Sequence, residues 1–183
     1  LLPGLLSPSD CAALAALYDA PQHFRSRIVM ARHGFGRGEY QYFAYPLPAV
    51  IEQLRHALYP PLARIANAWQ ARLSLPARYP AELPEFLARC HAAGQTRPTP
   101  LLLRYGAGDH NCLHQDLYGE HVFPLQLAIL LSAPGRDFSG GESVMAERTS
   151  DGQRADVLPL RQGDGVVFTV NERPVPGRRG GWR

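Results

Sequence analysis

The stretch from Leu101 to Asp116, LLLRYGAGDHNCLHQD, most constrains what this chain can fold into. It begins with an apolar run and ends with His114 and Asp116, which lie two positions apart. Residues two apart in an extended strand point to the same face, so the pattern predicts an imidazole and a carboxylate side by side. One metal ion could bind both, and a second histidine would complete a two-His-one-carboxylate triad that suits non-haem Fe(II). An H-x-D pair alone is common, and most such pairs are ordinary surface residues.

The residues around this pair resemble those of the 2-oxoglutarate/Fe(II) dioxygenases, and most closely the AlkB-like nucleic-acid dealkylases. In those proteins an R-Y-x-x-G segment leads, at the same distance, into L-H-x-D. The matching residues here are Arg104, Tyr105, Gly108, Leu113, His114 and Asp116. The resemblance implies that His114 and Asp116 are catalytic iron ligands and that the Tyr105 hydroxyl binds the 2-oxoglutarate carboxylate. Leu103 departs from the pattern, because the dealkylases usually have an asparagine there that also contacts the cosubstrate.

Two later segments extend the resemblance. Residues 138–142, FSGGE, resemble the F-x-G-G-E element that follows the iron strand in this superfamily, and residues 163–168 match its G-D-x-x-x-F turn and strand. The resemblance implies an α+β fold, a double-stranded β-helix (a jelly-roll, cupin-like barrel) with N-terminal helices packed on one side. Periodicity alone indicates only a mixed α and β chain. As a whole the chain looks most like an uncharacterised bacterial branch of oxygenases associated with damaged nucleic acid.

Size and composition agree with one globular domain. The chain has 183 residues, of which 45% are hydrophobic and 19% charged, and its net charge of +3 permits an acidic partner without requiring one. The three cysteines form no C-x-x-C pair, which predicts a reducing, cytoplasmic compartment. The opening LLPGLL is too short to span a membrane and lacks the basic flank of a secretory signal. We therefore expect a monomer with no membrane association.

Local signals predict most of the secondary structure. Ser7 and Pro8 are typical of a helix start, and residues 25–45 favour strands on either side of a glycine-rich turn. Residues 48–73 predict a helix that Pro60 and Pro61 should break or kink. A shorter helix is expected to end at Gly94. Residues 101–105 and 124–132 predict strands, and residues 148–155 an exposed loop.

The glycine-rich turn, HGFGRG at residues 33–38, has two interpretations. Its G-x-G-x-G spacing is not the dinucleotide-binding fingerprint, and no helix is predicted after it. It could be a mobile lid on which bases stack and phosphates pair, or the solvated tip of an ordinary hairpin. The residues that would act in a lid are Arg32, Phe35, Arg37, Tyr40 and Tyr42.

The predicted metal site is incomplete. In the family a second histidine lies in an H-x-V segment, followed by an arginine that pairs with 2-oxoglutarate, but this chain has no histidine after His121. We expect the chain to stop before that distal segment, with natural truncation as the alternative, and we assign no third ligand. His110 and His114 are four apart, as in a helical zinc pair, but Gly106 and Gly108 disfavour a helix there. His121 is either a substrate contact or a surface histidine.

These features lead to one functional hypothesis and two alternatives. The resemblance implies a dioxygenase that uses Fe(II) and 2-oxoglutarate, with ascorbate as a possible reductant, to demethylate alkylated DNA or RNA oxidatively. The F-x-G-G-E element also resembles prolyl hydroxylases, so the substrate could instead be a protein side chain or a small metabolite. A non-catalytic cupin-like binding module is the third possibility.

Overall fold

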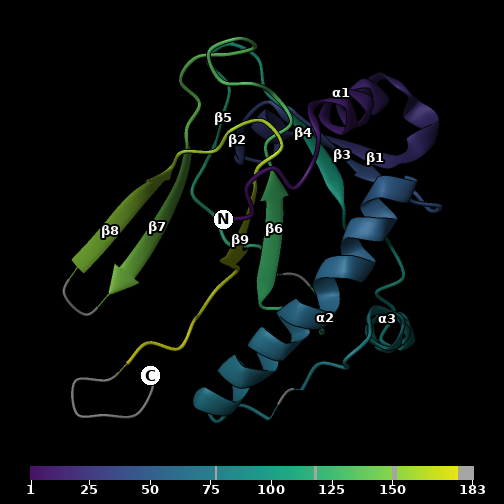
Figure 1. The fold of residues 1–183 in the computed structure, drawn as a ribbon, viewed down its shortest axis with the longest axis vertical. Coiled ribbons are helices and arrows are strands. Elements are labelled where there is room, and N and C mark those ends of the chain that lie inside the picture. Colours follow the sequence, from purple (N-terminus) through teal and green to yellow (C-terminus); the bar gives the residue numbers. More distant parts are fainter. Residues whose placement is uncertain (77, 118, 150–151, 177–183) are drawn as a thin grey trace. The chain divides into compact units, whose positions relative to one another are not determined.

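The computed structural model describes residues 1–76, 78–117, 119–149 and 152–176, which combine helices with short strands (Figure 1). The α-helices are α1 (Pro8–Ala16), α2 (Ala49–Arg72) and α3 (Leu83–Ala92). The strands are β1 (Phe24–Val29), β2 (Gly36–Arg37), β3 (Glu39–Phe43), β4 (Leu101–Arg104), β5 (His110–Asn111), β6 (Leu125–Ile129), β7 (Ser143–Thr149), β8 (Gly152–Leu158) and β9 (Gly165–Thr169). Single turns of 3-10 helix, η1 (Leu17–Asp19), η2 (Pro21–His23) and η3 (Met30–Arg32), connect the first elements.

The chain divides into two compact units. The first comprises Leu1–Tyr45, Thr99–His114 and Leu127–Val167, and the second comprises Pro46–Pro98, Gln115–Gln126 and Phe168–Arg183. The expectation of a single oxygenase domain over residues 1–183 stays a prediction.

The first unit is built on the antiparallel sheet β1-β3-β4. α1 precedes it and begins as predicted, because the Ser7 hydroxyl accepts from the Asp10 amide (3.1 Å) and the Asp10 carboxylate accepts from the Ser7 amide (3.3 Å). The predicted strands of residues 25–45 are β1 and β3, which pair with each other. Phe43 is fully buried, and its ring stacks on that of Phe24 with centroids 4.8 Å apart. Aromatic residues therefore hold this hairpin onto the core.

The glycine-aspartate turn before β9 is also present, and the N-terminal segment lies against it. Gly163 has φ +83°, and a Cβ there would lie 2.1 Å from the Leu6 carbonyl oxygen, so only glycine fits. The Gly163 amide donates to Leu130 (2.8 Å), and the Leu6 amide donates to Gly163 (3.0 Å). β9 pairs with β6. The strand predicted at residues 124–132 is thus confirmed with shorter bounds, and the strand that the resemblance implies after the glycine-aspartate turn is β9.

The prediction of a loop at residues 148–155 was wrong. β7 and β8 form an antiparallel hairpin in which Val144 pairs with Val157 and Ala146 with Ala155 (Figure 1). Both valines are exposed, Val157 at 60%, so no buried face imposes the alternation of apolar and polar residues that marks a strand in sequence.

The second unit is organised around α2 and α3. Tyr59, Ala63 and Leu83 are its buried core, and the rings of Tyr79, Phe86 and Phe123 pack against it. α2 runs from Ala49 to Arg72 without ending at Pro60 and Pro61, so the helix does not break there; the alternative that was predicted, a kink, stays a prediction. Burial of Tyr59 and Ala63 on either side of the prolines compensates for the two hydrogen bonds that the helix loses there. α3 ends before Gly94, as expected.

The α+β class is confirmed. Among the described residues the strands form sheets of two or three strands, and no closed barrel is present, so the double-stranded β-helix stays a prediction. No helix in the described part of the chain is both long and apolar enough to cross a membrane.

Candidate metal and cosubstrate site

His114 is exposed and follows β5 in an irregular segment, so the expectation that it lies in a strand was wrong. β5 has two residues, which pair with Gly36 and Arg37 of the glycine-rich turn. Next to this pair, the Cys112 amide donates to the Phe35 carbonyl (2.9 Å). Beyond Cys112, residues 113–117 are irregular and belong to no strand. The same-face rule for strands therefore does not orient His114 and Asp116.

The imidazole of His114 is oriented by the backbone instead. Its Nδ1 lies 2.8 Å from the carbonyl oxygen of Cys112. Because a carbonyl can only accept a hydrogen bond, Nδ1 must carry the proton, which leaves the lone pair of the neutral ring on Nε2. A histidine that ligates a metal typically donates its other ring N–H to a backbone carbonyl or a carboxylate in this way. The His114 side chain thus has the tautomer that a metal ligand requires.

Asp116 is half-exposed and belongs to the second unit, whereas His114 ends the first. The residue before Asp116 contacts the segment that follows β9. The side-chain amide of Gln115 donates to the side-chain oxygen of Asn171 (3.1 Å). The same segment after β9 is also bonded to the residue before β6, because the Val170 amide donates to the Pro124 carbonyl (3.1 Å). Within the ranges that the structure describes, no group of three or more His, Cys, Asp or Glu side chains could hold a metal ion. Two donor side chains, one imidazole and one carboxylate, remain as candidates.

The predicted cosubstrate residue Tyr105 is brought to the segment that leads to His114. Its side chain hydrogen-bonds with that of Asn111, the second residue of β5. Its ring lies over Gly38, where a Cβ would come within 2.8 Å of the Tyr105 ring. Burial and the charge of Asp109 raise the pKa of Tyr105, and the Asn111 bond only partly opposes them. The phenol therefore stays protonated near neutral pH and can donate to a carboxylate.

The glycine-rich turn is paired rather than free. A Cβ on Gly36 would lie 2.2 Å from the His110 carbonyl oxygen, so glycine is required for β2 to approach β5. At the turn, Phe35 is 41% exposed and stacks on His33 with ring centroids 5.3 Å apart. Arg37 lies 3.7 Å from Asp109. The turn is thus tied to the His114 segment through backbone bonds, which neither the lid nor the solvated-tip interpretation anticipated.

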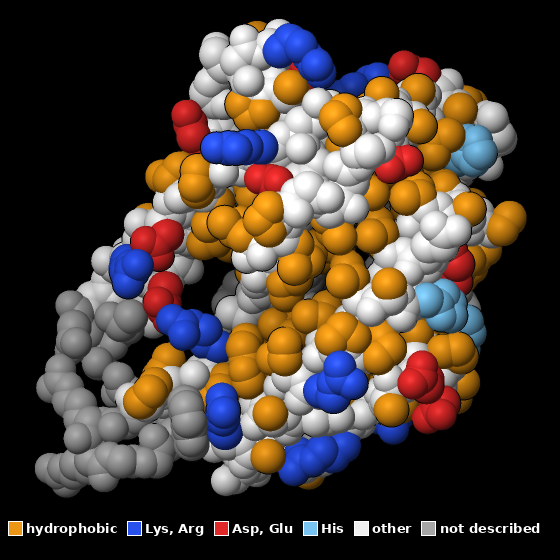
Figure 2. Space-filling model, viewed as in Figure 1, with side chains coloured by type: hydrophobic (Ala, Val, Ile, Leu, Met, Phe, Trp, Pro, Cys, Tyr) orange, Lys and Arg blue, Asp and Glu red, His pale blue; other side chains and the backbone are white. Residues whose placement is uncertain are grey.

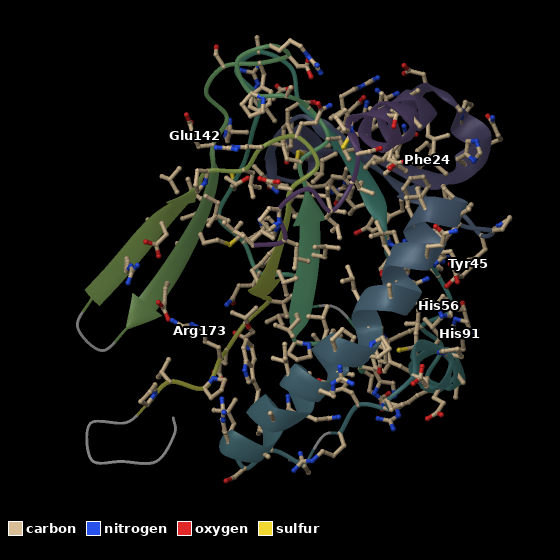
Figure 3. The ribbon with its side chains drawn as sticks, viewed as in Figure 1. Phe24, Tyr45, His56, His91, Glu142 and Arg173 are labelled. Atoms are coloured by element: carbon tan, nitrogen blue, oxygen red, sulfur yellow. The ribbon has the colours of Figure 1, made fainter. Side chains whose placement is uncertain are left out.

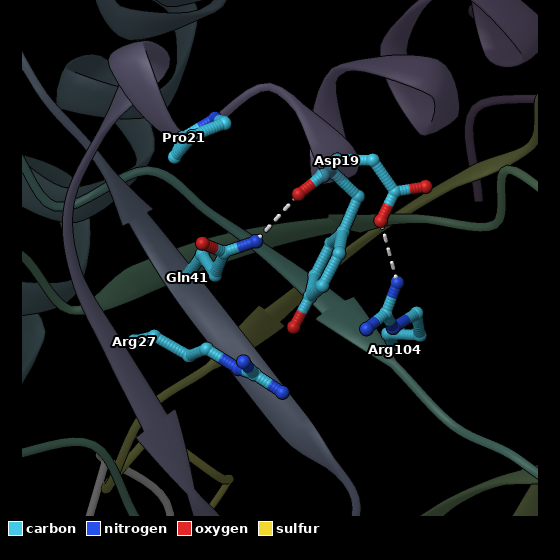
Figure 4. A pocket seen from close by; sticks show the side chains of 6 residues that line it. Asp19, Pro21, Arg27, Gln41 and Arg104 are labelled. Carbon is cyan, nitrogen blue, oxygen red and sulfur yellow. Dashed lines mark hydrogen bonds and ion pairs between the residues drawn. The ribbon is translucent and has the colours of Figure 1, made fainter.

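Arg104, to which sequence reasoning gave no role, is the centre of an ion-pair network (Figure 4). Its guanidinium bonds to Asp19 (2.9 Å) and Glu39 (2.6 Å) and lies over the Tyr18 ring, 4.1 Å from the centroid. Arg27 bonds to the same Glu39 carboxylate. Burial alone would raise the pKa of Glu39, but the bonds and charges of Arg27 and Arg104 outweigh it and lower that pKa.

The network lines a cavity of about 200 Å³ beside η1 and the three-stranded sheet. The charged side chains of the lining, Asp19, Arg27 and Arg104, each form an ion pair within the described chain. We therefore interpret this cavity as part of the scaffold and not as a binding site. Arg104 joins the end of β4 to β3 and η1, and so fixes the backbone from which Tyr105 departs. The register places Glu39 directly opposite Arg104, a pairing that no local sequence signal reveals.

Comparisons with known proteins identify the family of the chain. A family model described as "Oxygenase, catalysing oxidative methylation of damaged DNA" matches residues 38–183. Two uncharacterised proteins of Mycobacterium tuberculosis, from strains CDC 1551 / Oshkosh and ATCC 25618 / H37Rv, are each 52% identical over 139 residues. That alignment covers 75% of this chain and 60% of each relative's length. No solved structure matches. The chain therefore belongs to the Oxygenase-NA family.

Proposed function

We propose that the protein is an Fe(II)- and 2-oxoglutarate-dependent dioxygenase that oxidatively demethylates alkylated bases in damaged nucleic acid. The observation that carries the proposal is the bond between His114 Nδ1 and the Cys112 carbonyl, which presents Nε2 as a donor in a chain of an oxygenase family. The family description supports damaged DNA as the substrate. The aligned part of the chain spans 60% of the length of each relative, so the activity of the whole protein is itself a proposal.

The donor set fits iron. A neutral imidazole from His114 and a carboxylate from Asp116 suit Fe(II) at a facial triad that leaves positions for cosubstrate and oxygen. The third ligand, a histidine, and the arginine for the distal carboxylate of 2-oxoglutarate are proposed to lie outside the described residues. Tyr105 fits the cosubstrate because its protonated hydroxyl can donate to a carboxylate. We also propose that the strands belong to a double-stranded β-helix.

The bound iron, with 2-oxoglutarate and O₂, would insert one oxygen atom into a C–H bond of the substrate while releasing succinate and CO₂. On an N-methylated base the product is a hydroxymethyl group, whose C–N bond breaks to give formaldehyde and the free base. The chemistry of an oxygenase favours this loss of the methyl group over methyl transfer, which would need a methyl donor. The base must leave the stack to be reached.

The test is turnover by the full-length protein. Formaldehyde and succinate are measured from an N-methylated oligonucleotide with Fe(II), 2-oxoglutarate and ascorbate. We expect His114→Ala to lower the rate by more than about 100-fold, because loss of a metal ligand exceeds the effect of losing a supporting residue. The matched control is His91→Ala, which removes an exposed histidine of α3 and should leave the rate unchanged (Figure 3). Unchanged activity in His114→Ala would refute the assignment.

Other outcomes separate the alternatives. A gain of one oxygen on a peptide or metabolite, without formaldehyde from oligonucleotides, would indicate a hydroxylase. Failure of the full-length protein to take up Fe(II) stoichiometrically would indicate a binding module without catalysis. We further propose a cytoplasmic monomer, and light scattering of the 183-residue chain should then give a mass near 20.2 kDa.

A further inference from the structure

A second cavity, of about 190 Å³, lies within the second unit. Its lining combines cationic, aromatic and backbone groups from α3, the segment before α3 and residues 120–122. The residues that matter here are Arg78, Tyr79, Phe86, Arg89, Glu120 and His121. Neither the metal site nor the sequence motifs account for this cavity.

Side chains hold one wall of the cavity in place. The Gln95 amide clamps His121 by accepting from its backbone N–H (2.8 Å) and donating to its carbonyl (3.2 Å). The Tyr79 hydroxyl donates to the Val122 carbonyl (2.8 Å). Gly119 lies so close to Gln95 that a Cβ would come within 2.4 Å of its amide nitrogen. The segment that begins four residues after Asp116 is therefore preorganised rather than a loose loop.

The cavity carries positive charge. Arg89 donates to the Arg78 carbonyl (2.6 Å), which fixes one edge of its guanidinium and leaves other N–H groups for a ligand. Within the described residues, no carboxylate lies at ion-pair distance from Arg89. Glu120 is the one carboxylate in the described lining, against two arginines. Burial raises the pKa of Tyr59 to about 12 and raises that of Tyr79, and in both cases the charge of Arg89 opposes the rise.

We propose that this cavity binds a backbone phosphate of the nucleic-acid strand, a reading that rests on the proposed function for its substrate class. At about 190 Å³ the cavity is smaller than the roughly 300 Å³ at which pockets for drug-sized ligands begin, so it suits a single phosphate rather than a whole nucleotide. Arginine is the side chain whose planar donors match phosphate oxygens in pairs. All 19 basic residues of the chain are arginines, and arginine side chains are scattered over the face drawn in Figure 2. The cavity is therefore distinguished by two arginines in one lining and not by a broad basic patch. Such contacts position a strand without reading its sequence.

The experiment measures binding of a fluorescent single-stranded oligonucleotide to the full-length protein between 50 and 200 mM salt, concentrations at which phosphate contacts dominate affinity. For Arg89→Gln we expect about tenfold weaker binding, the scale of a hydrogen bond to a charged group. The slope of log K against log salt should fall by about 0.7, the value for one phosphate of a single strand. Arg89→Lys should keep most of the slope because it keeps the charge.

The matched control is Arg64→Gln, which removes an exposed arginine of α2 that does not line the cavity. It should change affinity less than about twofold, because salt screens an exposed charge that makes no direct contact with the phosphate. Arg78→Gln provides a second test should Arg89→Gln unfold, as judged by circular dichroism. Equal affinity and equal slope for Arg89→Gln and Arg64→Gln would overturn the proposal.

Two further measurements separate this proposal from the proposed function. His114→Ala should bind the oligonucleotide like the wild type even though it lacks turnover. Arg89→Gln should keep the wild-type rate of succinate release on a free methylated nucleoside, which has no phosphate. Binding of inorganic phosphate alone is measured by calorimetry for the same variants. If Arg89→Gln weakens only the binding of inorganic phosphate, and oligonucleotide binding is unchanged, the cavity takes a small anion and the proposal fails.

Discussion

At the scale of single residues, side chains outside the sequence motifs fix the positions of side chains within them. Glu39 shows this most clearly, because one carboxylate, 14% exposed, holds two arginines that sit on β1 and β4. Removing this carboxylate leaves two half-exposed arginines without their shared partner, so water and salt offset only part of the loss. Glu39 therefore matters to the position of Tyr105 although it is remote from it in sequence.

We expect Glu39→Gln to lower the free energy of unfolding at pH 7 by about 2 kcal/mol, the cost of hydrogen bonds to charged groups. The folded-state pKa of Glu39 lies below its ordinary value of 4.5, so its contribution is fully present above that value. The contribution is lost as the pH falls through the lowered folded-state pKa. Urea unfolding at several pH values should show the wild type and Glu39→Gln converging in acid. A difference that stays constant down to pH 2 would contradict the linkage.

Gly163 offers a second test at this scale. Gly163→Ala meets both a positive φ and the Leu6 carbonyl, whereas Gly135→Ala meets a similar φ of +80° with open space around it. We expect Gly135→Ala to cost about 1–2 kcal/mol from backbone strain alone. Gly163→Ala should cost at least about 2 kcal/mol more, since backbone would have to move. Thermal unfolding of both variants measures the difference, and equal losses would show that the close approach is absent.

At the scale of elements, packing decides where a helix ends as much as propensity does. α2 continues through two prolines although each removes one backbone hydrogen bond, because Tyr59, Ala63 and Ala66 remain buried along it. Its length is thus maintained by tertiary contacts against an unfavourable local sequence. β7 and β8 show the opposite case, a regular hairpin with little burial, held by backbone pairing over seven residue pairs.

Pro61→Ala should raise the free energy of unfolding by about 2 kcal/mol. The alanine N–H can bond to the Ala57 carbonyl, and this gain exceeds the entropy that the unfolded chain recovers. Pro84→Ala is the control, because Pro84 lies in the first turn of α3, where no helical N–H bond is made. Denaturant midpoints and slopes give both values. Destabilisation by Pro61→Ala would mean that the proline ring itself is required for packing.

At the scale of the whole molecule, the proposed activity predicts a stability that depends on its ligands. Anaerobic Fe(II) with 2-oxoglutarate should stabilise the full-length protein by about 2.7 kcal/mol at a concentration 100 times the dissociation constant. His114→Ala should lose this gain, while His91→Ala should retain it. Scanning calorimetry with and without ligands measures the shift. Equal shifts in His114→Ala and the wild type would place the ions elsewhere.

The sequence by itself determined the elements whose signals are local. The helix start at Ser7 and the end of α3 before Gly94 follow from residues within a few positions of each other. The pairing of β1 with β3 joins residues 10 to 19 positions apart across a glycine-rich turn. The resemblance of the motifs to known oxygenases implied the oxygenase family, and the comparisons agree. The roles of His114, Asp116 and Tyr105 and the barrel stay predictions.

Tertiary structure alone decided the rest. Arg104 meets Glu39 across 65 residues, and Gln95 clamps His121 across 26, so no local pattern encodes either contact. β5 ends at Asn111, which leaves His114 outside the strand that spacing had predicted. Local preferences are worth a few tenths of a kcal/mol per residue, and the pairing and burial of distant segments outweigh them. Because long-range contacts outweigh local preferences, the sequence could predict the residue types of the candidate site but not the contacts that surround them.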